Sequence, residues 1–165
     1  VRPPARVRAI LGVDKALKVR RLNLADGEPF ARVTVWCPEE LGAELSRSQV
    51  QERSFYELLP VDFGGATQTI GADAASADDA ELLQVPVGSP VLVCERITAD
   101  AAGTAVLIGE YVFPAHRTEF TVDLGVERPR CDLFVVRAWS GLRVVLHRAS
   151  GHVEQREALD GAVDS

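Results

Sequence analysis

The feature that most constrains the fold is a hairpin pattern that occurs twice in the chain. Residues 20–38 (RRLNLADGEPFARVTVWCP) alternate in polarity on both sides of Asp26-Gly27, a pair that supplies the positive φ of a tight reversal. The pattern recurs 76 positions later in residues 96–114 (RITADAAGTAVLIGEYVFP). Two repeats are too few for a solenoid, so they predict one closed, pseudo-symmetric unit that shares a sheet.

Short helices and further strands are expected around these hairpins. We expect strands over 19–24, 30–36, 66–74, 91–98, 104–113 and 119–124. Proline, glycine and capping signals predict helices over 5–11, 39–46, 54–59 and 78–83. Together these elements predict an α+β fold with a six-stranded, mostly antiparallel sheet, short flanking helices and a pseudo-twofold internal repeat.

Length and charge limit the classes of protein to be considered. At 165 residues the chain has the length of a single domain. The net charge of -6 argues against a nucleic-acid-binding surface on this chain. No apolar segment approaches the roughly 20 residues that a membrane-spanning helix needs. We expect one domain over 1–125, followed by an extension over 126–165 that contains a hairpin at 131–148 and a loose tail.

Cysteine and histidine usage favours no metal or disulfide chemistry. Three cysteines, Cys37, Cys94 and Cys131, are widely spaced, without a C-x-x-C motif. They are best explained as buried thiols in a reducing compartment, so we expect a cytoplasmic protein. The three histidines lie far apart and are expected to be unconnected surface residues. Because the chain begins with valine, we expect a fragment or a processed chain.

Several blocks of the sequence, in order, resemble one known family. They include RRLNLADGEPFARVTVWCPEEL, SFYELL and QTIGADAASADDAELLQVPVGSP, within about residues 3–124. The chain resembles the UTRA domain, the effector-binding domain that follows a winged helix-turn-helix in GntR-type regulators of the HutC branch, whose fold is similar to chorismate lyase. The resemblance implies a six-stranded sheet, a small-molecule pocket, homodimerisation, and DNA contact only through a missing module that belonged before Val1.

The resemblance also implies a binding site. In sugar-phosphate-sensing members, an R-x-R pair, two glutamates, a tyrosine and an S-x-Y motif line the pocket. This sequence keeps the first arginine and the S-x-Y motif, and replaces the remaining polar positions. The corresponding ligand-binding residues are Arg21, Asn23, Val33, Ser54, Tyr56, Leu107 and Phe113.

The physical character of these residues predicts the kind of effector. Ser54 precedes the N–H groups of a helix start, and with Arg21 it forms a plausible site for phosphate or carboxylate. Val33, Leu107 and Phe113 cannot bind sugar hydroxyls, which would be buried unpaired at roughly 1–3 kcal/mol each. We therefore expect an effector with an acidic group and a largely apolar or aromatic body.

Each of these residues also has a simpler interpretation. Ser54 can be a helix cap that needs no ligand, Tyr56 can merely pack its ring, and Arg21 can be a surface arginine. Arg96 occupies the position of Arg20 in the second repeat, and we expect it to form a structural salt bridge with a carboxylate such as Glu110. Trp36 and Trp139 are expected to be core or interface anchors.

No catalytic signature accompanies these features. The chain lacks G-x-S-x-G, a P-loop, G-x-G-x-x-G after a strand and H-E-x-x-H, so we predict a sensor rather than an enzyme, without cofactor or metal. Two alternatives stay open. One is a chorismate lyase-like enzyme, with Arg21 and Glu110 as its candidate catalytic pair. The other is an oligomerisation module without a ligand.

Overall fold

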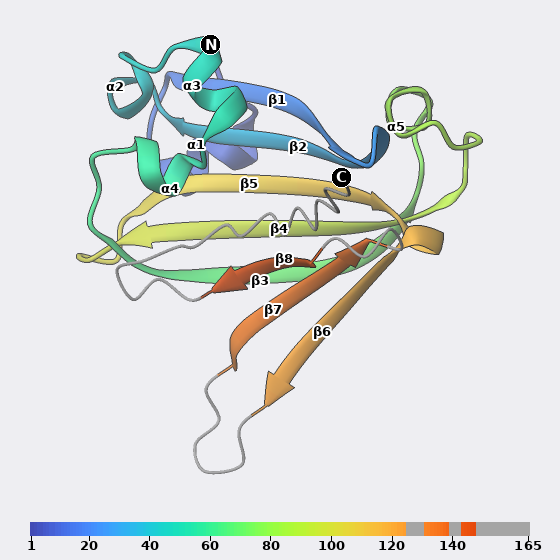
Figure 1. Cartoon of the computed structure of the whole chain (residues 1–165). Coiled ribbons are helices and arrows are strands. Elements are labelled where there is room, and N and C mark those ends of the chain that lie inside the picture. Colours follow the sequence, from blue (N-terminus) through green and yellow to red (C-terminus); the bar gives the residue numbers. More distant parts are fainter. Residues whose placement is uncertain (125–130, 139–142, 148–165) are drawn as a thin grey trace, which may run out of the picture.

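The central element is a five-stranded antiparallel sheet, seen in the computed structural model of the chain (Figure 1). The structure describes residues 1–124, 131–138 and 143–147. The strand order is β1-β2-β5-β4-β3. The strands are β1 (Ala16–Ala25), β2 (Glu28–Pro38), β3 (Phe63–Ala74), β4 (Pro90–Asp100) and β5 (Ala105–Pro114). The helices are α1 (Ala5–Leu11), α2 (Glu39–Gly42), α3 (Arg47–Glu52), α4 (Phe55–Leu58) and α5 (Ala77–Leu83).

Both predicted hairpins are present. In the β1–β2 turn, Asp26 has a φ of 52° and Gly27 a φ of 78°, the left-handed conformation expected of an Asp-Gly reversal. In the β4–β5 turn, Gly103 has a φ of 87°. The α+β class and the antiparallel sheet are confirmed. Each of the four hairpin strands ends one or two residues beyond the range predicted from the alternation of polarity.

The expected pseudo-twofold repeat organises the centre of the sheet. Strands β2 and β5 are neighbours, and Thr34 lies opposite Glu110, 76 positions later in the chain. A twofold axis between these two residues relates the two hairpins. The same twofold relation holds for the helices, because α1 packs on β5 and α5 packs on β2. Both helices end at a left-handed residue, Gly12 after α1 and Gln84 after α5.

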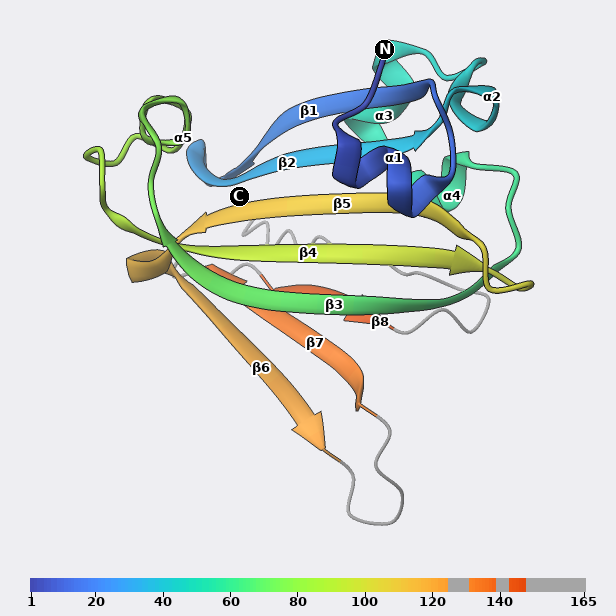
Figure 2. The same ribbon diagram turned by 180° about the vertical axis from the view of Figure 1, so that it is seen from behind.

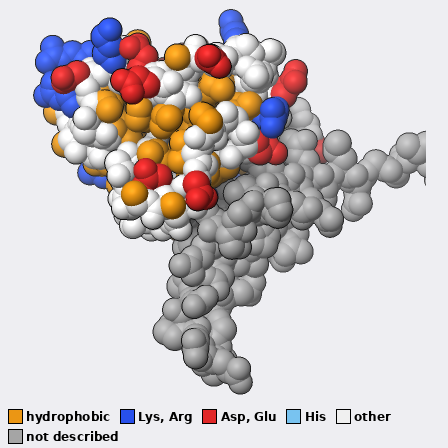
Figure 3. Space-filling model, turned by 90° about the vertical axis from the view of Figure 1, so that its left-hand side faces the viewer, with side chains coloured by type: hydrophobic (Ala, Val, Ile, Leu, Met, Phe, Trp, Pro, Cys, Tyr) orange, Lys and Arg blue, Asp and Glu red, His pale blue; other side chains and the backbone are white. Residues whose placement is uncertain are grey.

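The sheet has two covered faces. The α1/α5 face carries two hydrophobic clusters, one beneath α1 and one beneath α5, and Figure 2 shows α1 lying across it. The α3/α4 face carries the largest cluster, in which sheet residues pack against Val50, Phe55 and Leu59 from the helical segment. At the end of the molecule that carries α2 and α4, hydrophobic side chains gather at the centre and charged ones at the rim (Figure 3).

The segment between β2 and β3 differs from the expectation of a single helix over 39–46. That prediction is wrong: α2 ends at Gly42, which packs so closely that an added Cβ would lie 2.5 Å from a methyl carbon of Leu17. A new helix, α3, then begins after Ser46, whose side chain accepts from the Gln49 N–H while the Gln49 side chain accepts from the Ser46 N–H. Helix α4 follows it, after Ser54.

The expected sixth strand does not join the main sheet. After β5, Pro114 and the 3₁₀ turn Ala115–Arg117 redirect the chain, and β6 (Thr118–Leu124) pairs with β7 (Cys131–Ala138) (Figure 1). Strand β7 pairs in turn with β8 (Arg143–His147), which makes a second, three-stranded antiparallel sheet. The predicted loose tail falls outside the described residues. None of the described helices has both the length and the apolar character that a membrane span requires.

Candidate functional site

The predicted binding residues all come from the α3/α4 face or from the start of α4. Side chains alternate along a strand, so Arg21 and Asn23 on β1 share a face with Leu17 and Val19, which pack in the α3/α4 cluster. The apolar members of the set are nearly inaccessible: Val33, Leu107 and Phe113 are 1%, 4% and 5% exposed. They form part of the same hydrophobic cluster.

Arg21 meets the junction between α3 and α4. Its Nη1 donates to the carbonyl oxygen of Val50 at 3.0 Å and lies 3.5 Å from that of Arg53, the residue before Ser54. Ser54 and Glu57 form a capping box, in which the Ser54 Oγ faces the Glu57 N–H and the Glu57 carboxylate accepts from the Ser54 N–H at 3.0 Å. Within the described residues, no acceptor takes a hydrogen bond from the buried Ser54 Oγ or the buried Arg21 Nε. Two donors therefore remain unsatisfied at one corner of this face.

Aromatic side chains extend from this corner across the sheet. The Tyr56 hydroxyl lies 2.8 Å from the Thr98 Oγ1, and its ring packs edge-on against Phe63 with centroids 5.0 Å apart. On β5, the rings of Tyr111 and Phe113 stack with centroids 6.2 Å apart. The α3/α4 face thus combines a polar corner with aromatic side chains.

The Tyr111 ring lies over a glycine in its own strand. A Cβ added at Gly109 would come within 2.9 Å of a ring carbon and 3.0 Å of the hydroxyl oxygen of Tyr111. Burial, reinforced by the nearby Tyr56, raises the pKa of Tyr111 to about 12, although Arg96 and Arg21 act in the opposite direction. The Tyr111 hydroxyl is therefore protonated at neutral pH and can serve as a hydrogen-bond donor.

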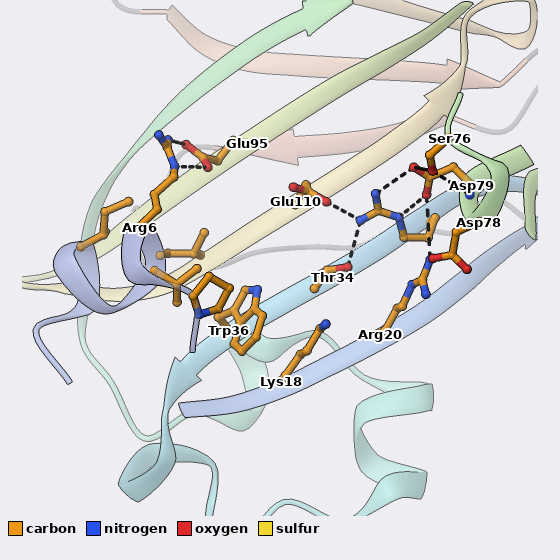
Figure 4. Close-up of a pocket in the computed structure, with 15 residues that line it drawn as sticks. Arg6, Lys18, Arg20, Thr34, Trp36, Ser76, Asp78, Asp79, Glu95 and Glu110 are labelled. Atoms are coloured by element: carbon orange, nitrogen blue, oxygen red, sulfur yellow. Dashed lines mark hydrogen bonds and ion pairs between the residues drawn. The ribbon is translucent and has the colours of Figure 1, made fainter. Parts of the chain in front are cut away.

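The α1/α5 face holds a pocket of about 450 Å³ between the two helices (Figure 4). Its apolar wall includes Trp36, and the Lys18 ammonium lies 5.0 Å from the centre of that ring. At its centre, Arg32 donates to both carboxylate oxygens of Asp79 at 2.7 and 3.3 Å, and to Glu110. The same guanidinium donates to the Thr34 hydroxyl at 2.9 Å.

Ion pairs within the chain satisfy most of the charge in this pocket. Burial alone would raise the pKa of Asp79, but hydrogen bonds from Arg32 and Ser76 and the positive charge of Arg32 and Arg20 lower it overall. Arg20 also pairs with Asp78. These ion pairs therefore connect α5 to β1 and β2 (Figure 4).

The profile of one protein family, described as the UTRA domain, matches residues 1–119. The chain belongs to the UTRA domain family. It is 32% identical over 128 residues to the "HTH-type transcriptional regulator Rv0792c" of Mycobacterium tuberculosis, a match that covers 73% of this chain and 48% of that protein. The chain therefore spans about half the length of this curated relative.

Solved structures have the same UTRA fold. A transcriptional regulator from Streptomyces coelicolor is 34% identical, with a TM-score of 0.65 over 68% of this chain and 79% of that one. A GntR-family transcriptional regulator from Enterococcus faecalis V583 is 24% identical and shares the fold, with a TM-score of 0.69 over 74% of this chain and 93% of that one. The UTRA domain described here is homologous to part of an HTH-type transcriptional regulator.

The structure changes the roles expected of two residues in the second hairpin. The predicted salt bridge between Arg96 and Glu110 is wrong, because the two side chains point to opposite faces of the sheet. Arg96 donates to the Gln68 side-chain oxygen from Nε at 2.8 Å and also from Nη2. Glu110 instead pairs with Arg32 on the α1/α5 face.

Sequence reasoning missed some polar residues that the fold buries. Arg32 and Thr98 are 9% and 0% exposed, and neither was singled out. A signal for Arg32 exists, since it is the one charged residue in the apolar run from Pro29 to Pro38. Its partner Asp79 could not be found in this way, because it lies 47 positions away on another element.

The cysteines and histidines give no sign of a metal site in the described residues. Cys37 and Cys94 are buried free thiols, as expected, and burial raises the pKa of each to about 11. The side chain of Cys131 lies outside the described part. His116 is exposed in the 3₁₀ turn, and within the residues described no group of three possible metal ligands occurs.

Proposed function

We propose that this UTRA domain senses a small-molecule effector on its α3/α4 face, as part of a HutC-branch GntR-type regulator. The observation that carries the proposal is the corner formed by Arg21 and Ser54. Ser54 is 3% exposed, its hydroxyl has no acceptor among the described residues, and it lies beside the backbone segment that the guanidinium contacts. A bound anion would supply acceptors for both groups.

The remainder of the face supports an effector with an apolar or aromatic body. Val33, Leu107 and Phe113 offer no hydrogen bonds, and each sugar hydroxyl buried against them would lose roughly 1–3 kcal/mol. Tyr56 and Tyr111 add aromatic rings that carry hydroxyl groups to this apolar surface. An aromatic or aliphatic carboxylate fits this combination better than an amino-sugar phosphate.

In the proposed mechanism the effector shifts a dimer between two arrangements. Ligand binding between β1 and the start of α4 favours one arrangement of a cytoplasmic homodimer, and this changes the spacing of DNA-binding modules outside this chain. The domain itself performs no chemistry and requires no cofactor. The curated relative, named an HTH-type regulator, supports a DNA-binding partner module.

A thermal-shift screen of the 165-residue chain tests the proposal. The panel contains benzoate, biphenyl-4-carboxylate, glucosamine 6-phosphate and N-acetylglucosamine 6-phosphate. A ligand at 100 times its Kd adds about 2.7 kcal/mol of stability, so the apolar acids should raise the Tm by several degrees. Arg21→Gln should abolish this rise, and Arg8→Gln, at a partly exposed position on α1, should preserve it.

Three results would contradict the proposal. Larger shifts with the amino-sugar phosphates would refute the chemistry assigned to the effector. The absence of any shift with the panel would favour an oligomerisation module. Release of pyruvate from chorismate, measured with lactate dehydrogenase and NADH, would show that the domain is an enzyme rather than a sensor.

A further inference from the structure

The strand register changes which arginines are equivalent in the two halves. The sequence repeat aligns Arg96 with Arg20. In the sheet, however, Arg21 lies opposite Val33, and Arg96 lies opposite Gly109, which is 76 positions after Val33. The register of β4 on β5 differs by one residue from that of β1 on β2. Arg96 is therefore the structural counterpart of Arg21, and both belong to the α3/α4 face.

Neither arginine contacts a carboxylate among the residues that the structure describes. Arg21 donates to the backbone carbonyl of Val50, and Arg96 to the side-chain oxygen of Gln68. Arg96 is only 8% exposed, and the amide nitrogen of Gln68 beside it is buried without a partner. A buried guanidinium without a counter-ion is unfavourable, so this region is suited to receive an anion.

The two arginines lie at opposite ends of one patch. Three strand spacings and two residues along the strand place their Cα atoms roughly 16 Å apart, since strands lie about 4.8 Å from one another and rise about 3.3 Å per residue. Tyr111 lies between them, and the charges of both arginines act on its hydroxyl. Val33 and Gly109 also lie between them, so the Tyr111 hydroxyl is the polar group of an otherwise apolar stretch. A ligand that reached both arginines would cross this stretch, against the Tyr111 ring.

We propose that Arg96 is a second anion-binding residue of this site, and that the effector is a diacid whose acidic groups bind Arg21 and Arg96. This inference rests on the proposed function and deepens it. The apolar body of the effector lies across the centre of the face, against the aromatic rings. The Gln68 amide, which has no acceptor among the described residues, and the Tyr111 hydroxyl supply neutral donors beside this second acidic group.

Calorimetric titration of the 165-residue chain with matched acids tests the proposal. The monoacids are benzoate and biphenyl-4-carboxylate. The diacids are phthalate, isophthalate, terephthalate and biphenyl-4,4′-dicarboxylate, which vary the spacing of the acidic groups. Hydrogen bonds to charged groups are worth enough to change affinity tenfold or more, so at least one diacid should bind ten times more tightly than its monoacid.

Variants of Arg96 show whether this preference belongs to the proposed residue. Arg96→Met should reduce the affinity for that diacid at least tenfold, to the level of the monoacid, and change monoacid affinity less than twofold. Arg96→Lys should recover part of the loss. Arg20→Met, on the opposite face (Figure 4), is the matched control and should leave the diacid preference unchanged.

The outcomes separate a binding role from a structural one. If Arg96 were structural, Arg96→Met would lower the Tm of the free protein and weaken both classes of acid equally, which would overturn the proposal. A diacid preference that survives in Arg96→Met would also overturn it. If monoacids bind and no diacid binds better, this inference fails and the proposed function stands. If no acid binds, both fail.

Discussion

Replacing Arg32 by methionine should destabilise the domain far more than replacing any exposed arginine. Arg32 is 9% exposed and joins Asp79 of α5 to Glu110 of β5. Methionine preserves the apolar stem and removes the charge, so the Asp79 carboxylate stays partly buried without its main partner. The variant therefore isolates the contribution of the ion-pair network at the pseudo-twofold axis.

The burial of the partners sets the magnitude. Breaking a buried ion pair by removing one partner costs about 3–5 kcal/mol. The side chain of Asp79 is 14% exposed, but that of Glu110 is 44% exposed and regains water readily. We therefore expect the lower end, about 3 kcal/mol. With a urea m-value of about 2 kcal/mol/M, the midpoint should fall by about 1.5 M.

Urea denaturation at pH 7, followed by circular dichroism, measures this change. Arg6→Met is the matched control, because Arg6 pairs with Glu95 at the surface and its loss should lower the urea midpoint far less. The double variant Arg32→Met/Asp79→Leu should recover much of the stability, since it leaves no unpaired charge. Equal losses in the two single variants would refute the reasoning.

The pH dependence provides a second check on the same pair. The folded-state pKa of Asp79 is lowered, because hydrogen bonds and charge from Arg32 outweigh burial. Its stabilising contribution is therefore present above the unfolded pKa of about 3.9 and is lost as the pH falls through the folded value. The difference between wild type and Arg32→Met should shrink below about pH 4, and a constant difference would contradict this assignment.

Two further predictions concern packing and thiol reactivity. Gly109→Ala should cost about 1–3 kcal/mol of stability, because the new Cβ must displace the Tyr111 ring. Gly71→Ala, where an added Cβ meets nothing within 4 Å, should change the Tm little. Equal Tm values for the two variants would contradict this prediction. Cys37 and Cys94, with pKa values of about 11, should react with iodoacetamide at pH 8 only after unfolding, and rapid labelling in the folded protein would show that they are accessible.

The hairpins could be predicted from sequence because their determinants are local. Asp26-Gly27 requires only backbone sterics to define the first reversal, and alternation specifies which side chains share a face. The same local logic correctly predicted the first helix, Ala5–Leu11, with Gly12 at its end. The capping pattern of α3, from Ser46 to Gln49, was equally readable in the sequence, and we overlooked it.

The remaining features depend on interactions that sequence patterns do not encode. The second turn has one residue more than the first, five between Ala99 and Ala105 against four between Leu24 and Pro29. Arg96 therefore lies on the face opposite Arg20, although the repeat alignment matches the two residues. Likewise, β6 pairs with β7 rather than with a strand of the main sheet. This pairing depends on which strand edge is available after Pro114, which is a property of the tertiary structure.

The most direct test of the central claim is a crystal structure of the chain with the acid that produces the largest thermal shift. The account predicts electron density for the ligand on the α3/α4 face, with its acidic group within hydrogen-bond distance of Arg21 and the Ser54 hydroxyl. Density in the α1/α5 pocket, beside Lys18 and Trp36, would contradict it, as would a bound ligand that leaves the Ser54 hydroxyl unpaired.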